Sequence, residues 1–162
     1  MRFIQGVNML KKIILTLFFA FVFAPGVFAD EISDVKTFFN NFVNASNTYA
    51  TNLPSYYVPN AKIVRVVYKP DGTTQDVVIP FDRYLQELKK GAVLAKTVKY
   101  KNRYENQKVT KSGSDYKLSA IRIPRNDKTG LPAHFIITKT KNGFKIKEEY
   151  MGTNVQKFLN AK

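Results

Sequence analysis

The chain has 162 residues and is strongly basic, with 26 Lys and Arg against 12 Asp and Glu and a net charge of +14. It contains no cysteine and one histidine, His134, which excludes thiol catalysis, thiolate metal sites and multi-histidine metal centres. We therefore expect no metal ion and no cofactor. The positive charge attracts anionic partners such as lipid head groups, cell-wall polymers or nucleic acid, although an excess of lysine is also typical of plain solubility.

Residues 1–29 are typical of a secretory signal peptide. A basic start precedes an apolar run over residues 13–24, and the small side chains of Val27 and Ala29 follow a Pro-Gly turn. The run has about a dozen residues, whereas a membrane-spanning helix takes about 20. We therefore expect cleavage between Ala29 and Asp30 and export to the periplasm or beyond.

The rest of the chain, residues 30–162, is long enough for one packed core and too short for two ordinary domains. We expect a single domain there. Met9 is an alternative initiator to Met1, because it begins a conventional signal sequence by itself. A retained anchor, as in a membrane-bound subunit of a secretion system, stays open as an alternative to cleavage.

The first expected element is a helix that begins at about residue 30. Apolar side chains recur at spacings of three and four on one face: Ile32, Val35, Phe39, Phe42, Tyr49 and Leu53. A short helical turn over residues 53–59 follows. The period then changes to two, and Pro70-Asp71-Gly72 separates two β-branched runs, which predicts a hairpin with Lys69 opposite Thr73.

A short helix is expected from Phe81 to about Gly91, and the remainder is typical of β structure. Two more hairpins are expected, with strands over residues 98–109 and 114–123, and over 133–140 and 144–150. A brief helix ends the chain. Helices thus come early and strands late, which predicts an α+β domain.

The segment Tyr57-Val58-Pro59-Asn60-Ala61-Lys62-Ile63 resembles the signature that enters the first strand in many members of the nuclear transport factor 2-like superfamily, with Asn60 replacing the common aspartate. The resemblance implies a cystatin-like cone, in which a long N-terminal helix and short helices pack in the concave face of a strongly curved antiparallel sheet. The superfamily contains ketosteroid isomerase-type and polyketide cyclase-type enzymes, dehydratases, secretion-system subunits and non-catalytic binding domains.

Strand register predicts the contents of such a cone. With Thr110 opposite Ser114, the even-numbered residues of the second hairpin face inward, which brings Asn102 opposite Arg122. With Thr140 opposite Phe144, His134 and Glu148 also face inward. A two-residue loop in the last hairpin would turn His134 outward and keep Glu148 inward. The expected pocket residues are Arg122, Glu148, Asn102, Tyr100, Tyr104 and His134.

Arg122 and Glu148 are expected to form the decisive polar pair, because an unpaired buried charge is costly. One alternative is that this ion pair is purely structural. A second is that Arg122 orients the carboxylate or phosphate of a ligand, and a third is that His134 acts as a general base. In isomerase relatives an inward aspartate acts as the base, and Asp76 is the only aspartate here that is a candidate for that position. We therefore name no catalytic residue.

The outer face of the sheet is expected to be basic, and its apolar residues Ile121, Ile123, Phe135 and Ile137 suggest a homodimer through that face. The expected basic surface comprises Lys99, Lys101, Arg103, Lys117, Lys145 and Lys147.

The sequence therefore predicts an exported, non-catalytic binding or assembly module. It engages an anionic or amphipathic small ligand, an envelope protein or an anionic surface, and it has no specific affinity for nucleic acid. Two alternatives are a small cone enzyme of the isomerase or cyclase type and a membrane-anchored secretion-system subunit.

Overall fold

The structure is a computed structural model that describes residues 25–124 and 127–160. It has an α+β fold with two α-helices and a six-stranded mixed sheet. The elements in chain order are α1 (Pro25–Asn47), η1 (Leu53–Tyr56), β1 (Tyr57–Tyr68), β2 (Thr74–Ile79), α2 (Phe81–Thr97), β3 (Asn102–Ser112), β4 (Asp115–Pro124), β5 (Leu131–Thr140), β6 (Gly143–Thr153) and η2 (Gln156–Asn160).

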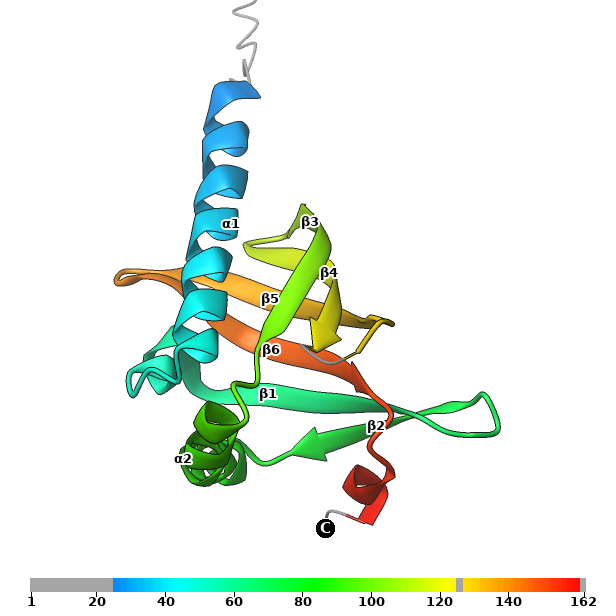
Figure 1. Cartoon of the computed structure of the whole chain (residues 1–162). Helices are drawn as coiled ribbons and strands as arrows, with labels where there is room; N and C mark the ends of the chain where they lie inside the picture. Colours follow the sequence, from blue (N-terminus) through cyan, green and yellow to red (C-terminus); the bar gives the residue numbers. More distant parts are fainter. Residues whose placement is uncertain (1–24, 125–126, 161–162) are drawn as a thin grey trace, which may run out of the picture.

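The strands lie in the order β2-β1-β6-β5-β4-β3, and β1 pairs with β6 in parallel while the other pairs are antiparallel. α1 crosses one face of the sheet, which we call the inner face, and α2 lies beside the β1–β2 edge (Figure 1). The expectation of an antiparallel sheet is therefore wrong at one pair. The sheet is also not strongly curled, so the expected strong curvature is not found.

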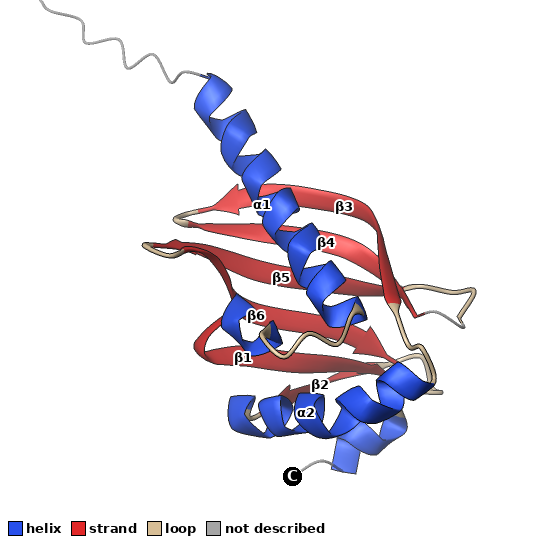
Figure 2. Cartoon of the chain, turned by 60° about the vertical axis from the view of Figure 1, so that its left-hand side comes forward, coloured by secondary structure: helices blue, strands red, loops and turns tan. Residues whose placement is uncertain are grey.

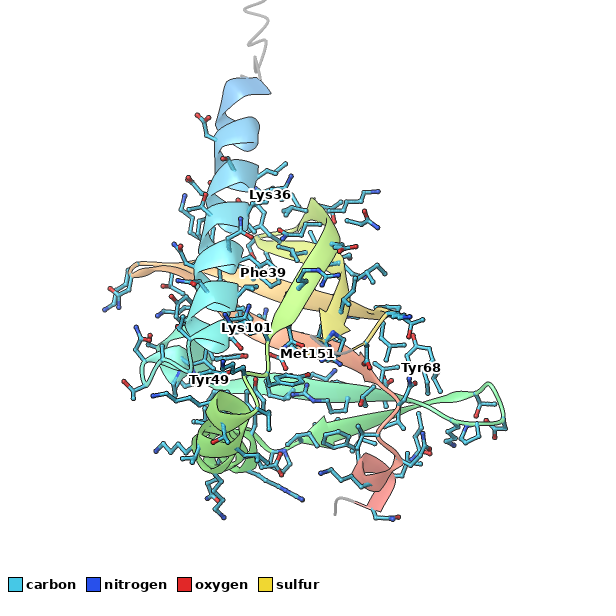
Figure 3. All side chains as sticks on the ribbon, viewed as in Figure 1. Lys36, Phe39, Tyr49, Tyr68, Lys101 and Met151 are labelled. Carbon is cyan, nitrogen blue, oxygen red and sulfur yellow. The ribbon has the colours of Figure 1, made fainter. Side chains whose placement is uncertain are left out.

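Aromatic side chains fix α1 on the inner face. Phe39 is fully buried, with its ring centroid 4.8 Å from that of Phe135 on β5 and 5.2 Å from that of Tyr104 on β3. Phe42 also contacts Phe135, at 5.9 Å between the centroids. Figure 3 shows Phe39 between α1 and the sheet. Burial of such aromatic rings contributes most of the stabilising free energy of a core, so these contacts hold the helix on the sheet.

Polar contacts hold α1 at both ends. Near its start, Glu31 forms ion pairs with Lys111 and Lys139, each at 3.1 Å, and accepts a hydrogen bond from Tyr116. These bonds, first that of Tyr116, lower the pKa of Glu31 to about 2. At the C-terminal end, Asn47 exchanges two hydrogen bonds with the backbone of Asn102. The start of β3 is therefore fixed to the end of α1.

α2 is longer than expected, because it continues through Gly91 to Thr97. The amides of Lys99 and Tyr100 donate to the carbonyls of Lys96 and Ala95, with Lys99 in the left-handed region at φ 50°. This is a Schellman motif, the usual end of a helix, although glycine is the usual residue at the left-handed position. β3 consequently begins at Asn102 and not at residue 98.

Irregularities in the strands change which residues share a face. The first hairpin has the expected register, with Lys69 bonded to Thr73 and Gly72 at φ 81°. In β6 the pairing shifts between Ile146, opposite Ile137, and Glu148, opposite Ile136, so Lys147 is an extra residue in a β-bulge. A second bulge in β3 lies at Asn106 and Gln107. Both bulges decide which side chains face α1.

Candidate functional site

A cavity of about 900 Å³ lies between the C-terminal half of α1, α2 and the inner face of β3, β4 and β6. Its lining is largely apolar, with Leu88 and Ala92 from α2 and Met151 from β6. Figure 3 shows Tyr49 and Met151 close to this region, between α1, α2 and the sheet. Large apolar cavities that contain a few convergent polar groups are the usual form of small-molecule sites.

Arg122 forms the first polar centre of the cavity. Its Nη1 donates to Asn102 Oδ1 at 3.0 Å and to Tyr100 Oη at 3.2 Å, while its Nη2 donates to the carbonyl of Gly152 at 2.9 Å. Its Nε is buried and has no hydrogen-bond partner. No described carboxylate forms an ion pair with this guanidinium, so its charge is held by neutral acceptors alone.

The partners of Arg122 are placed by α1 and by the end of α2. The Schellman motif turns the chain so that Tyr100 faces back to the cavity, and Tyr49, in the turn after α1, donates a hydrogen bond to the Tyr100 carbonyl. Asn47 fixes the backbone of Asn102 as described above. A side-chain arrangement supported by a second layer of hydrogen bonds keeps its geometry before any ligand binds.

Glu149 of β6 forms the second polar centre and is fully buried. Its Oε1 accepts from Arg65 Nη1 at 2.8 Å, and its Oε2 accepts from Tyr57 at 2.6 Å and from Tyr84 at 3.4 Å. Arg65 and Tyr84 line the cavity, while Glu149 lies behind them. The carboxylate is therefore fully committed to partners within the protein.

The electrostatics of the site keep its tyrosines protonated and Arg65 charged. Burial, followed by the charge of Glu149, raises the pKa of Tyr57, Tyr84 and Tyr104. Burial alone would lower the pKa of Arg65, but the Glu149 carboxylate raises it above its ordinary value. The charge of Glu149 raises the pKa of Tyr104 and that of Arg122 lowers it. The Tyr104 hydroxyl has no hydrogen-bond partner among the described residues. It is thus available to a ligand as a donor.

The structure brings four of the six expected pocket residues together: Arg122, Asn102, Tyr100 and Tyr104 all line the cavity. The expected face of Arg122 is correct. Its partner in register is Tyr104, however, and Asn102 lies opposite Pro124, because the β3 bulge and a two-residue loop shift the hairpin.

The expected inward position of Glu148 is wrong. The extra residue at Lys147 turns Glu148 to the outer face and brings Glu149 inside. His134 is on the outer face as well, where its ring stacks on Tyr150 at 4.2 Å between centroids. The expected Arg122–Glu148 pair therefore does not form, and Glu148 instead contacts Lys62 and Tyr150.

The outer face also differs from the expectation. Phe135 and Ile137 belong to the core under α1. Ile121 and Ile123 are on the outer face, but the chain itself covers them, since a Cβ on Gly130 would lie 2.2 Å from Ile121 Cγ2. The apolar residues that suggested a homodimer through this face therefore already have neighbours within the chain, and the homodimer stays a prediction.

The expected basic residues are spread over several surfaces. Arg103 and Lys117 are exposed on the sheet, and Lys147 pairs with Asp115 at 2.9 Å. Lys145 is half-buried and donates to the carbonyl of Ser55. Lys99 and Lys101 precede β3, so they lie beside the end of α2 rather than on the outer face of the sheet, which corrects their expected place.

Arg65 and Glu149 are the site residues that the sequence analysis missed. The period-two pattern of β1 carried a signal for Arg65, because it shares a face with the buried Ile63 and Val67. Tyr57 and Tyr84 were noted only as tyrosines. Glu149 carried no usable signal, since it follows another glutamate and its face depends on the bulge.

The described residues contain no group of three or more metal-ligating side chains near one another. Within residues 25–124 and 127–160, neither α-helix combines the length and the apolar character needed to cross a bilayer. Residues 1–24 of the expected signal peptide lie outside these residues, whereas the bond expected to be cleaved, between Ala29 and Asp30, lies within α1.

Comparison with solved structures shows the nuclear transport factor 2-like fold. An NTF2-like protein with a cystatin-like fold from Novosphingobium aromaticivorans superposes with a TM-score of 0.61 at 7% identity, covering 80% of this chain and 86% of that one. An NTF2-like protein of unknown function from Pseudomonas putida gives a TM-score of 0.60 at 8% identity, over 76% and 87%.

A candidate scytalone dehydratase from Novosphingobium aromaticivorans is similar in the same way, with a TM-score of 0.58 at 11% identity over 78% and 85% of the two chains. No protein-family model matches the sequence, and no curated protein matches it. Identities this low show the fold alone, which confirms the resemblance drawn from residues 57–63.

Proposed function

We propose that this chain is an exported, non-catalytic binding module whose cavity holds a small amphipathic anion. The observation that carries the proposal is Arg122, a cation that lines an apolar cavity and has no carboxylate partner among the described residues. A guanidinium in such a place is stabilised when a ligand supplies the missing negative charge. The apolar lining suits the remaining body of the ligand.

The identity of the polar groups favours a carboxylate or phosphate at the anionic end. Arg122 has a buried Nε without a hydrogen-bond partner, and no described residue forms a hydrogen bond with the Tyr104 hydroxyl. Both are donors, as an anion requires. Arg65 adds positive charge to the same cavity, although Glu149 balances it.

A second candidate, a small enzyme of the isomerase or cyclase type, has less support. General acid–base catalysis needs an acid and a base within reach of the bound substrate. His134 and Asp76, which we considered as bases, belong to the outer face in the pairing of β1, β2, β5 and β6, and so does Glu148. Glu149 is committed to Arg65 and two tyrosines.

The proposal is tested with two fluorescent probes that differ in charge. Anilinonaphthalene sulfonate is an apolar aromatic body with an anionic group, and N-phenylnaphthylamine is its uncharged analogue. We expect the unmodified protein to bind the anionic probe more tightly, because only that probe pairs with Arg122. Arg122→Gln should remove this preference, with a loss of about tenfold or more for the anionic probe.

The matched control is Arg103→Gln, since Arg103 is exposed and pairs with Glu105 on the sheet. It should bind both probes as the unmodified protein does. Near-ultraviolet circular dichroism of each variant checks that the fold is retained. An unchanged preference for the anionic probe in Arg122→Gln would show that the cavity does not recognise anions through this residue.

A further inference from the structure

The C-terminal half of α2 is apolar on two opposite faces. One face is directed to the cavity and the sheet through Tyr84, Leu85, Leu88, Ala92 and Ala95. The other face carries Val93 and Leu94, which are 74% and 67% exposed, and Val98 at the end of the helix is 56% exposed. A helix on the surface of a protein needs only one apolar face, so the second face is left without a partner in the described structure.

Leu94 and Val98 are four residues apart and are therefore neighbours on the helix surface. Val93 precedes Leu94 in the chain and lies on the next part of the same exposed side of the helix. The Schellman motif at Lys99 fixes the conformation of this end of the helix. In Figure 2 α2 lies along the lower edge of the molecule, outside the sheet. The apolar cluster thus projects from an ordered helix.

Lysines surround the cluster, and the sequence from Leu88 to Lys101 contains no acidic residue. Lys89 and Lys90 precede Val93 and Leu94 by one helical turn, and Lys96 follows them within the helix. Exposed Lys99 and Lys101 lie in the turn just after it. We call the surface formed by Lys89, Lys90, Val93, Leu94, Lys96, Val98, Lys99 and Lys101 the basic apolar patch.

A lipid surface with anionic head groups matches this combination better than a second copy of the chain. In a two-fold dimer through the patch, the lysines of one copy would face those of the other, and like charges that meet across an interface oppose binding. At a membrane, apolar side chains enter the boundary between head groups and acyl chains, while lysines extend to the anionic head groups.

We propose that the basic apolar patch docks on an anionic lipid surface, with Val93, Leu94 and Val98 inserted and the lysines at the head groups. The apolar part of the patch is separate from the ligand site, because none of the three apolar residues lines the cavity, while Lys89 lies at the border of both. The opposite side of the same helix does line it, through Ala92 and Ala95. Docking therefore places the cavity beside the lipid surface.

The absence of cysteine makes a site-specific test simple. A single cysteine at Val93→Cys, labelled with the environment-sensitive fluorophore nitrobenzoxadiazole, reports on its own position in the full chain. On addition of vesicles made of phosphatidylcholine with phosphatidylglycerol, we expect its emission to shift to the blue and to intensify. The same label at Asn142→Cys, in the exposed β5–β6 loop, should show no shift.

Charge variants test the role of the lysines. In the labelled Val93→Cys chain, Lys90→Glu with Lys96→Glu should raise the lipid concentration needed for half of the response about tenfold or more. The control pair Lys117→Glu with Lys141→Glu changes the net charge equally at exposed sites on β4 and in the β5–β6 loop, and it should change the response much less.

Three results would overturn the proposal. The first is no shift at Val93→Cys with anionic vesicles. The second is an equal shift with vesicles of phosphatidylcholine alone, which would exclude the selection of anionic lipid. The third is a shift that depends on protein concentration without vesicles, which would assign the patch to a protein partner. Arg122→Gln should leave the vesicle response unchanged, so this proposal and the ligand proposal fail separately.

Discussion

Glu149 is the residue on which the buried polar network depends. It is the acceptor for Arg65, Tyr57 and Tyr84 at once, and its side chain is fully buried. Replacing one member of such a pair leaves the other charge buried without compensation, which costs more than the pair itself contributes. Loss of either Glu149 or Arg65 alone should therefore destabilise the fold more than loss of both together.

A double-mutant cycle tests this dependence. Glu149→Gln should lower the free energy of unfolding by on the order of 3–5 kcal/mol, because Arg65 loses its counter-charge. Glu149→Gln combined with Arg65→Met should recover much of that loss, since both charges are then removed, and Arg65→Met alone completes the cycle. The measurement is urea unfolding of the single and double variants.

The control for this cycle is the exposed pair Arg83–Glu87, 3.1 Å apart and one turn apart on α2. Removing Glu87 from that pair should cost about 0.5 kcal/mol or less. A Glu149→Gln variant no less stable than this control would contradict the assignment of Glu149 as a buried, paired charge.

The attachment of α1 to the sheet depends on pH, because Glu31, near the start of the helix, is a titratable group. Glu31 accepts a hydrogen bond from Tyr116 and pairs with Lys139 and Lys111, so its pKa falls from 4.5 to about 2 on folding. A carboxyl group with a lowered pKa in the folded state stabilises the fold above its unfolded pKa. That stabilisation is lost progressively as the pH falls from about 4.5 towards 2.

We therefore expect Glu31→Gln to be less stable than the unmodified chain near neutral pH. The difference should shrink through the same pH window and vanish at its lower end, because protonated Glu31 resembles glutamine. Urea midpoints of both proteins across that window provide the measurement. A difference that stays constant with pH would mean that the charge of Glu31 contributes nothing to the attachment of α1.

Strand irregularities explain most of what the sequence could not predict about the site. The face of Arg122 was predicted correctly, because alternation along β4 is regular where Arg122 lies. Tyr100, Tyr104 and Asn102 also line the cavity as expected. Glu148 was misplaced by a single extra residue, Lys147. A bulge has no strong signature in one sequence, and it reverses the face of every residue beyond it.

At the scale of the whole molecule, local patterns predicted the types of element and their order well. The hairpin at Gly72 and the aromatic stripe of α1 are determined by neighbours in sequence, which explains the success. The parallel pairing of β1 with β6 joins Tyr57 to Ile146 and was not predicted. Such a contact is decided by the packing of the complete sheet, and a pattern of period two does not distinguish parallel from antiparallel neighbours.

α1 begins at Pro25, so the bond between Ala29 and Asp30, where we expect cleavage, lies inside this helix. Peptidases cleave extended segments, and a helical bond must unwind before it reaches a protease active site. Processing at this bond should therefore precede the docking of α1, which sets an order of events: cleavage first, folding second.

The order is testable with purified signal peptidase in detergent. The full chain should be cut after Ala29 quickly when it is added from denaturant, and slowly once it has folded, as followed by mass spectrometry. Glu31→Gln, which weakens the attachment of α1, should speed the cleavage of the folded chain. Equal rates for the folded and the freshly diluted chain would show that the helix does not protect the bond. Cleavage could then take place after folding as readily as before it.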